Sequence, residues 1–248
     1  MSEGQATPLD RRTRAVDYAG RYQTLGYVAD RVSQAVLACL KDRAAPLVLE
    51  LGCGTGETSL AVARARPDAN VIGLDISAVN IAAAERAKAE SGVDKRVSFE
   101  TADFMRWQGP QVDLIFGESV LHLVEADSSQ LAEKLANTLR PGGQLVFTIP
   151  RDCFRNDILF LLRRVWSIFP RAPADRMALA VARRVYSDLP DDLLRDRLGY
   201  LRLIPERTDG TKFRDLLRRN GLSLVRREIW PVTTLLQASH SFSVWRKE

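Results

Sequence analysis

Five short apolar or β-branched runs, separated mostly by helical patterns, constrain the fold of this chain more than any other feature of its sequence. The runs occupy residues 47–51, 71–74, 97–100, 112–116 and 144–149. Near-continuous apolar strands that alternate with helices are typical of a parallel sheet buried between two layers of helices. With two later strands at 222–230 and 240–245, the sequence predicts an α/β fold: a Rossmann-like, doubly wound, seven-stranded and mostly parallel sheet.

Helical patterns fill most of the gaps between these runs. They occupy residues 27–40, 58–66, 78–90, 129–139 and 211–219. Ser77 is the expected N-cap of the third helix, and Pro141 with Gly142 is expected to end the fourth. Between residues 150 and 205 the alternation gives way to two amphipathic patterns, at 158–169 and 177–198, which predict a helical insertion after the fifth strand.

Four segments follow from this organisation. They are an N-terminal helical cap segment (1–45), a Rossmann-like core (46–150), the helical insertion (151–207), and a C-terminal helix with two strands that completes the core sheet (208–248).

Charge and cysteine content limit the classes of protein that fit. The net charge is +5, yet residues 47–150 carry 9 basic against 14 acidic side chains, so the outer segments are basic. This contrast indicates two sites of opposite electrostatic preference, or a solvated surface of paired charges. Three cysteines without CxxC spacing and two histidines support neither a disulfide framework nor a metal site. The longest apolar run is residues 158–162, too short for a membrane span, so a cytoplasmic protein is expected.

Glycines and acidic residues gather where the predicted strands end. Gly52, Gly54 and Gly56 follow the first strand in the stretch LELGCGTGET. Their spacing is GxGxG and not the GxGxxG of dinucleotide folds, which counts against a nicotinamide cofactor. Four acidic residues stand near the carboxyl ends of the first four strands: Glu50, Asp75, Asp103 and Glu118. Ligands of open parallel sheets bind at this edge, and an acidic rim favours a cationic ligand.

The stretches LELGCGTG, LDIS, TADF, VDLIFGESVLHLV and LRPGGQLVF resemble the successive signatures of class I S-adenosylmethionine-dependent methyltransferases of the small-molecule type. The resemblance spans roughly residues 20–150 and resumes at the last helix and strands. It implies S-adenosyl-L-methionine as the cofactor. The residues that it assigns to cofactor binding are Tyr22, Glu50, Gly52, Cys53, Gly54, Gly56, Asp75, Ile76, Asp103, Phe104 and Glu118.

Within that set the resemblance implies separate roles. The glycines and Glu50 would receive the methionine part, and Asp75 would hold the ribose. Ile76 and Phe104 would pack against the adenine, whose amine Asp103 would contact. Tyr22 would close the site from the N-terminal segment, and Tyr18 could do the same. For both tyrosines, packing of a helix onto the sheet is an equally good interpretation.

Glu118 and His122 are the candidate catalytic residues, four positions apart after the fourth strand, where an acceptor must approach the methyl group. The sequence GES followed by His resembles C-methyltransferases that act on alkenes and some sugar O-methyltransferases. Glu118 would stabilise or deprotonate a cation in the first case and bind or deprotonate a hydroxyl in the second. His122 could instead be structural, and Glu118 could contact the cofactor's amino group.

The insertion is expected to form a lid and the acceptor pocket. Candidate substrate-binding residues are Tyr18, Arg151, Arg155 and Trp166. Further arginines at 163, 164, 183 and 184 make the insertion unusually basic. If these arginines converge inward, the acceptor carries a carboxylate, a phosphate or a diphosphate. If they face outward, they form a solvated surface or a dock for an acidic carrier protein.

The sequence therefore indicates a methyltransferase that acts on a small, anionic or partly apolar metabolite, such as an isoprenoid phosphate or a carboxylic acid, by C- or O-methylation. One alternative is carboxyl methylation of an acyl group on an acidic carrier protein. Another is a nonenzymatic sensor or assembly subunit that binds the cofactor. Nucleic acid is not an expected partner, because GESV stands where NPPY would be expected. A homodimer is compatible with the sequence.

Overall fold

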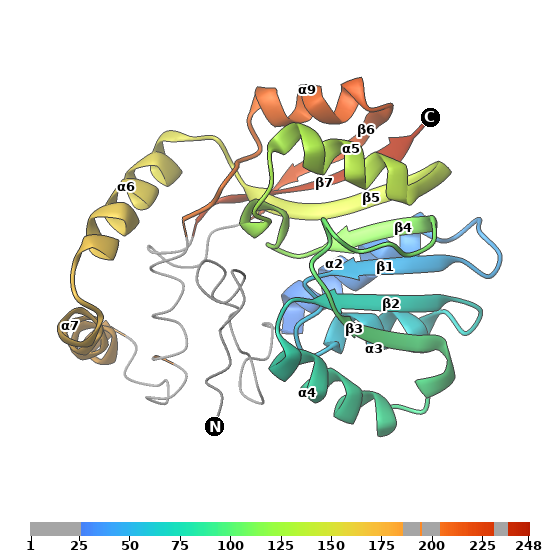
Figure 1. Ribbon diagram of the computed structural model, residues 1–248, viewed down its shortest axis with the longest axis horizontal. Coiled ribbons are helices and arrows are strands. Elements are labelled where there is room, and N and C mark those ends of the chain that lie inside the picture. The colour runs from blue at the N-terminus through green and yellow to red at the C-terminus, as the bar shows by residue number, and fades with distance from the viewer. Residues whose placement is uncertain (1–25, 186–193, 195–203, 231–237) are drawn as a thin grey trace, which may run out of the picture.

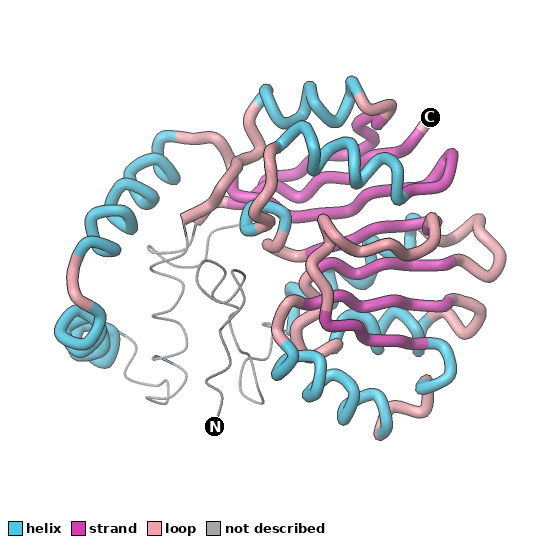
Figure 2. The backbone as a smooth tube through the Cα atoms, viewed as in Figure 1, coloured by secondary structure: helices cyan, strands magenta, loops and turns pink. Residues whose placement is uncertain are grey.

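The computed structural model describes residues 26–185, 194, 204–230 and 238–248. In these ranges seven strands form one sheet in the order β3-β2-β1-β4-β5-β7-β6. The parallel strands are β1 (Leu47–Leu51), β2 (Asn70–Asp75), β3 (Val97–Thr101), β4 (Val112–Gly117) and β5 (Leu139–Pro150). β7 (His240–Lys247) runs antiparallel between β5 and β6 (Leu222–Ile229). The prediction of a seven-stranded, mostly parallel sheet is confirmed (Figure 2).

Helices cover both faces of this sheet (Figure 1). The core on one face contains side chains of α2 (Gly26–Cys39), α3 (Glu57–Ala65) and α4 (Ala78–Ala89). The core on the other face contains side chains of α5 (Ser128–Thr138) and α9 (Thr211–Arg219). β1 pairs with both β2 and β4, so the strand order reverses beside it. Such a switch point at the carboxyl edge is where ligands of this architecture bind.

Most predicted boundaries agree with the structure to within one or two residues, and the N-cap at Ser77 is confirmed, since its Oγ accepts the N–H of Asn80 at 3.2 Å. The fourth helix ends before Pro141 and Gly142, within one residue of its predicted end, whereas β5 begins at Leu139 and not at the predicted Gln144. α5 ends at Thr138, and Pro141 and Gly142 lie in the irregular beginning of β5. The register with β4 shifts there, and Gly142 has a φ of 71°, which lets the chain bend without leaving the sheet.

The insertion begins with α6 (Phe154–Ile168) and α7 (Arg171–Val185), which follow the carboxyl end of β5. In Figure 1 both helices lie to the left, set apart from the sheet. α7 begins before the second predicted pattern, which spans residues 177–198. Most of the last part of that pattern lies outside the described residues. Two short 3-10 helices, η1 (Asp94–Arg96) and η2 (Leu121–Leu123), complete the elements used below.

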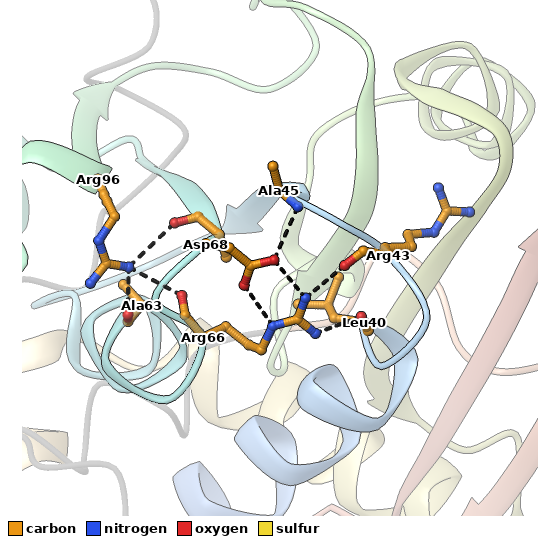
Figure 3. Close-up of polar contacts among 8 residues, drawn as sticks. Leu40, Arg43, Ala45, Ala63, Arg66, Asp68 and Arg96 are labelled. Atoms are coloured by element: carbon orange, nitrogen blue, oxygen red, sulfur yellow. Dashed lines mark hydrogen bonds and ion pairs between the residues drawn. The ribbon is translucent and has the colours of Figure 1, made fainter.

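At the amino-terminal ends of the parallel strands, the edge opposite their carboxyl ends, arginine side chains bond to backbone carbonyls of neighbouring segments (Figure 3). Arg66 donates from Nη1 to the carbonyl of Leu40 and from Nη2 to that of Arg43, each at 2.6 Å. Arg96 donates from Nη1 to the carbonyl of Ala63 at 2.6 Å. These carbonyls lie at or just beyond the ends of α2 and α3, where the helix supplies no partner. This edge is therefore held by charge-assisted hydrogen bonds, far from the site described next.

Candidate active site

Three glycines form the turn after β1, and all three have a left-handed backbone, with φ of 65° at Gly52, 53° at Gly54 and 81° at Gly56. Space is tight at two of them. A Cβ on Gly52 would lie 2.6 Å from a methyl carbon of Val120, and a Cβ on Gly56 would lie 2.4 Å from the ring of Phe99. Both the backbone angle and these neighbours exclude a side chain there, which explains the glycines locally.

Asp75, the last residue of β2, holds this turn in place. Its Oδ2 accepts the N–H of Gly54 at 2.9 Å, and its Oδ1 accepts the N–H of Ser77 at 2.8 Å and the amide of Asn80 at 3.3 Å. The side chain is buried. Asp75 therefore joins the ends of β1 and β2, and its predicted role toward a ribose stays a prediction.

Glu50 is buried beneath the turn, with Ser59 Oγ donating to its carboxylate. Burial raises the pKa of Glu50 to about 8, and the nearby negative charges of Glu118 and Asp75 act in the same direction. Two of the other predicted acidic residues, Asp75 and Glu118, thus lie within electrostatic reach of Glu50. A cationic group placed among them would relieve this repulsion and favour the ionised form of Glu50.

The remaining predicted cofactor residues differ in their surroundings. Cys53 is buried and donates its N–H to the carbonyl of Leu74 at 2.9 Å. Ile76 is 39% exposed, so one side of it is open to contact. Asp103 accepts the N–H of Met105 at 2.9 Å, and Phe104 is buried in the core of the α5 face. Tyr18 and Tyr22 lie outside the described residues.

Glu118 follows β4 directly and is half-buried. Burial raises its pKa to about 7. The next residue, Ser119, has a φ of 51°, a conformation that is uncommon for a side chain larger than glycine. The N–H of Ser119 donates to Thr148 Oγ1 at 2.8 Å, which ties this strained residue to β5. Backbone strain of this kind clusters at functional sites.

His122 lies in the 3-10 helix η2, which begins at Leu121 and so does not contain Glu118. Its side chain is 9% exposed, and Nδ1 has no hydrogen-bond partner among the described residues. Its ring centroid is 5.9 Å from that of His240. Burial lowers the pKa of His122 well below its usual value, and positive charge on His240, Arg163 and Arg207 lowers it further. His122 is therefore neutral near pH 7.

Arg207 fixes the loop that carries these two residues. Its guanidinium donates to the carbonyls of Leu121, Val124 and Ala126, the last two at 2.8 and 2.6 Å, and to Ser128 Oγ at 3.3 Å. Arg207 is 6% exposed. One side chain at the end of the insertion thus satisfies three carbonyls of the segment between β4 and α5.

Neither Arg207 nor His240 was singled out by sequence reasoning. Arg207 is 79 positions from Ser128, and His240 begins the last strand of the chain. No local periodicity encodes contacts at such separations. The density of basic residues in the insertion was the only signal, and it did not distinguish Arg207 from the exposed arginines.

The arginines of the insertion do not converge as one group. Arg163 is partly buried and near enough to both histidines to lower their pKa values. Arg151 lies beside Ser239, with its Nη1 3.4 Å from the hydroxyl. Trp166 is half-buried, with its ring centroid 6.3 Å from that of Phe169. Exposed members among the described residues include Arg155, Arg164, Arg176, Arg183 and Arg184.

The described residues offer neither a candidate metal site nor a candidate membrane-spanning helix. No group of three or more His, Cys, Asp or Glu side chains in this part of the chain is placed to hold a metal ion. None of the described helices has the length and apolar character that a membrane crossing requires.

Residues 48–143 match the family model described as a methyltransferase domain. The chain is 41% identical over 105 residues to the ubiquinone biosynthesis O-methyltransferase of Chelativorans sp. (strain BNC1), which covers 42% of this chain and 40% of that protein. It is 35% identical over 168 residues to the trans-aconitate 2-methyltransferase of Methylobacterium nodulans, which covers 67% of this chain and 61% of that protein. The chain spans about half the length of the curated relatives that it matches, between 35% and 53% for five of them.

One of the solved structures that resemble this fold covers most of the chain. It is the magnesium protoporphyrin IX methyltransferase of Synechocystis PCC 6803 with bound SAH, which has a TM-score of 0.62 and 19% sequence identity over 90% of this chain and 82% of that chain. At this identity the likeness supports the fold alone. The Rossmann-like fold predicted from the sequence therefore agrees with the fold of this solved structure.

Proposed function

We propose that the chain is a class I S-adenosylmethionine-dependent methyltransferase that transfers a methyl group to a small metabolite, which is anionic or partly apolar. The acceptor class that we favour is a carboxylic acid or an isoprenoid phosphate, methylated at carbon or oxygen. The observation that carries the proposal is the position of Glu118, which follows β4 directly and is half-buried, so that burial raises its pKa to about 7.

The residues at the carboxyl edge suit S-adenosylmethionine by their chemistry. Asp75 and Glu118 lie within electrostatic reach of Glu50, and a ligand with an ammonium and a sulfonium group would offset the repulsion between these carboxylates. Ile76 offers a partly exposed apolar side chain to the adenine. When bound, S-adenosylmethionine supplies an electrophilic methyl group. The protein's part is to align the acceptor with that methyl group and to exclude water.

Glu118 fits the role of the proton acceptor better than His122 does. A general base works best when its pKa is near the pH of the reaction, and Glu118 meets this condition. The pKa of His122 is lowered well below 6.5, so His122 is a weaker base. Its neutral ring, with a partner-free Nδ1 among the described residues, suits a hydrogen bond to the acceptor instead.

The positive charge of Arg163 near His122 and His240 supports an anionic acceptor. Arg163 reaches both histidines electrostatically, and its positive charge lowers both of their pKa values. An anionic group bound there would compensate the cation. The trans-aconitate methyltransferases among the relatives are named for a carboxylic acid, which agrees with this choice.

The test is methyl transfer by the purified chain from methyl-labelled S-adenosylmethionine to three sets of acceptors: free carboxylic acids, isoprenoid phosphates, and the same acids bound to a carrier protein. We expect label in a free acid or a phosphate, and loss of that label in Glu118→Gln. Transfer only to carrier-bound acid would replace the acceptor class. Tight cofactor binding without transfer to any acceptor would favour the sensor interpretation.

A further inference from the structure

α6 carries apolar side chains on two opposite faces. The first face packs inward: Leu159 and Phe160 are buried against Ala238. The second face is a stripe of five residues between 45% and 81% exposed, and its members are Phe154, Ile158, Leu161, Val165 and Ile168. Their spacing of four, three, four and three residues places them in one row along the helix. This row of side chains, called the outer stripe below, is largely exposed in the part of the chain that the structure describes.

α7 repeats the arrangement. Leu179 is buried, whereas Met177 and Val181, one helical turn apart, are 59% and 57% exposed. Buried and exposed apolar residues thus alternate around both helices. Scattered exposed hydrophobic residues are ordinary, but a continuous exposed row on two successive helices marks a surface that contacts something else.

The charge of these helices identifies what that partner must be. Residues 154–185 contain seven arginines and two aspartates. Five of the arginines are exposed, and they are Arg155, Arg164, Arg176, Arg183 and Arg184. A second copy of the same surface would bring like charges together, so self-association through this face is disfavoured. An apolar surface with an excess of arginine complements an anionic partner that also accepts hydrocarbon side chains.

We propose that α6 and α7 dock this protein on the surface of an anionic lipid bilayer. Helices with apolar residues on one side and arginine beside them lie in the plane of the membrane interface, held by apolar burial and by attraction to acidic headgroups. The docking is peripheral, which agrees with the lack of a membrane-spanning helix among the described residues. α6 has 15 residues and is about 22 Å long, enough to lay its whole outer stripe on the bilayer.

The position of the helices permits this docking. Both stand apart from the sheet in Figure 1, so a bilayer can meet them without covering the core. They also follow directly from β5, whose carboxyl end lies at the edge that carries Glu118 and Thr148. An acceptor that partitions into the bilayer would therefore be taken up next to the site.

The experiment is co-sedimentation of the full chain with vesicles of pure phosphatidylglycerol and, separately, of pure phosphatidylcholine. We expect binding to the anionic vesicles that weakens as salt is raised, and much weaker binding to the zwitterionic ones. Leu161→Asp combined with Ile168→Asp should lower the vesicle partition coefficient by at least about a hundredfold, because two side chains lose their apolar burial. Arg164→Glu combined with Arg184→Glu should lower it by at least about tenfold.

Val225→Asp is the matched control, because Val225 is 56% exposed on the edge strand β6 and makes no part of the outer stripe. It should bind vesicles as the unaltered chain does. Circular dichroism and retention of S-adenosylmethionine check that every variant is folded. Equal vesicle binding by the Leu161 and Ile168 variant would overturn the proposal. Absence of binding to phosphatidylglycerol vesicles would also overturn the proposal. This holds even if the outer stripe then proves to bind an acidic protein, or to form a dimer in sedimentation equilibrium.

Discussion

Asp75 accepts the backbone N–H of Gly54 at 2.9 Å, so the end of β2 fixes the glycine turn that follows β1. The same carboxylate also accepts the N–H of Ser77, the N-cap of α4. Two strand ends and one helix start therefore depend on a single side chain.

Asp75→Ala should weaken S-adenosylmethionine binding by at least about tenfold, because it removes the predicted ribose acceptor and releases the glycine turn. Isothermal titration calorimetry measures the affinity. Asp215→Ala, which removes an exposed carboxylate on α9, is the control and should leave the affinity unchanged. An unchanged affinity in Asp75→Ala would refute the ribose role.

Glu118→Gln should lower kcat by about a hundredfold to ten-thousandfold while keeping most of the cofactor affinity. In the unaltered chain the rate should rise with pH to a plateau above about 7, since the carboxylate must lose its proton to act as a base. The pH–rate profile of the variant should lack this limb. A large loss of cofactor affinity would instead assign Glu118 to the donor site.

Glu50 should make both stability and cofactor affinity depend on pH. Its pKa is raised from 4.5 to about 8 in the folded chain, so the folded state holds a proton that the unfolded state has lost. The free energy of unfolding should therefore fall as the pH rises from about 4.5 to about 8, by at most about 1.4 kcal/mol per pH unit from this group. Urea unfolding across this range measures the slope, and Glu50→Gln should reduce it.

Cofactor binding should respond to Glu50 in the opposite direction. A cationic ligand prefers the ionised carboxylate, so the affinity for S-adenosylmethionine should increase towards pH 8 and binding should release protons. Titration calorimetry in buffers of different ionisation enthalpy detects that release. If the affinity proves independent of pH in this range, Glu50 does not face the ligand's positive charge.

Arg207→Ala should reduce the free energy of unfolding by at least about 3 kcal/mol, because it leaves three carbonyls of the β4–α5 segment without their donor. Arg64→Ala, which removes an exposed arginine on α3, should change it by no more than about 0.5 kcal/mol.

Arg207→Lys tests the positioning role separately. It should lower kcat while KM for the cofactor and the pH midpoint near 7 stay unchanged.

The sheet and its cofactor edge could be predicted from the sequence because their signals are local. Apolar runs mark buried strands, Ser77 caps a helix, and the glycines of LELGCGTGET have a left-handed backbone that other residues avoid. The early start of β5, at Leu139 instead of Gln144, has a physical reason as well. Pro141 and Gly142 interrupt a helix and a strand alike, and only the register with β4 shows that both belong to the strand.

The sequence by itself determined the order of the strands' acidic ends, the helices between them and the basic character of the insertion, since each depends on residues within a few positions of one another. Only the tertiary structure decided that Arg207 holds the loop of His122, that His240 lies beside His122, and that Arg163 lies within electrostatic reach of both histidines while Arg155, Arg164, Arg176, Arg183 and Arg184 are exposed. Burial and electrostatic environment are properties of groups brought together from distant parts of the chain. They set the pKa values on which the proposed chemistry depends, so no local pattern could have supplied them.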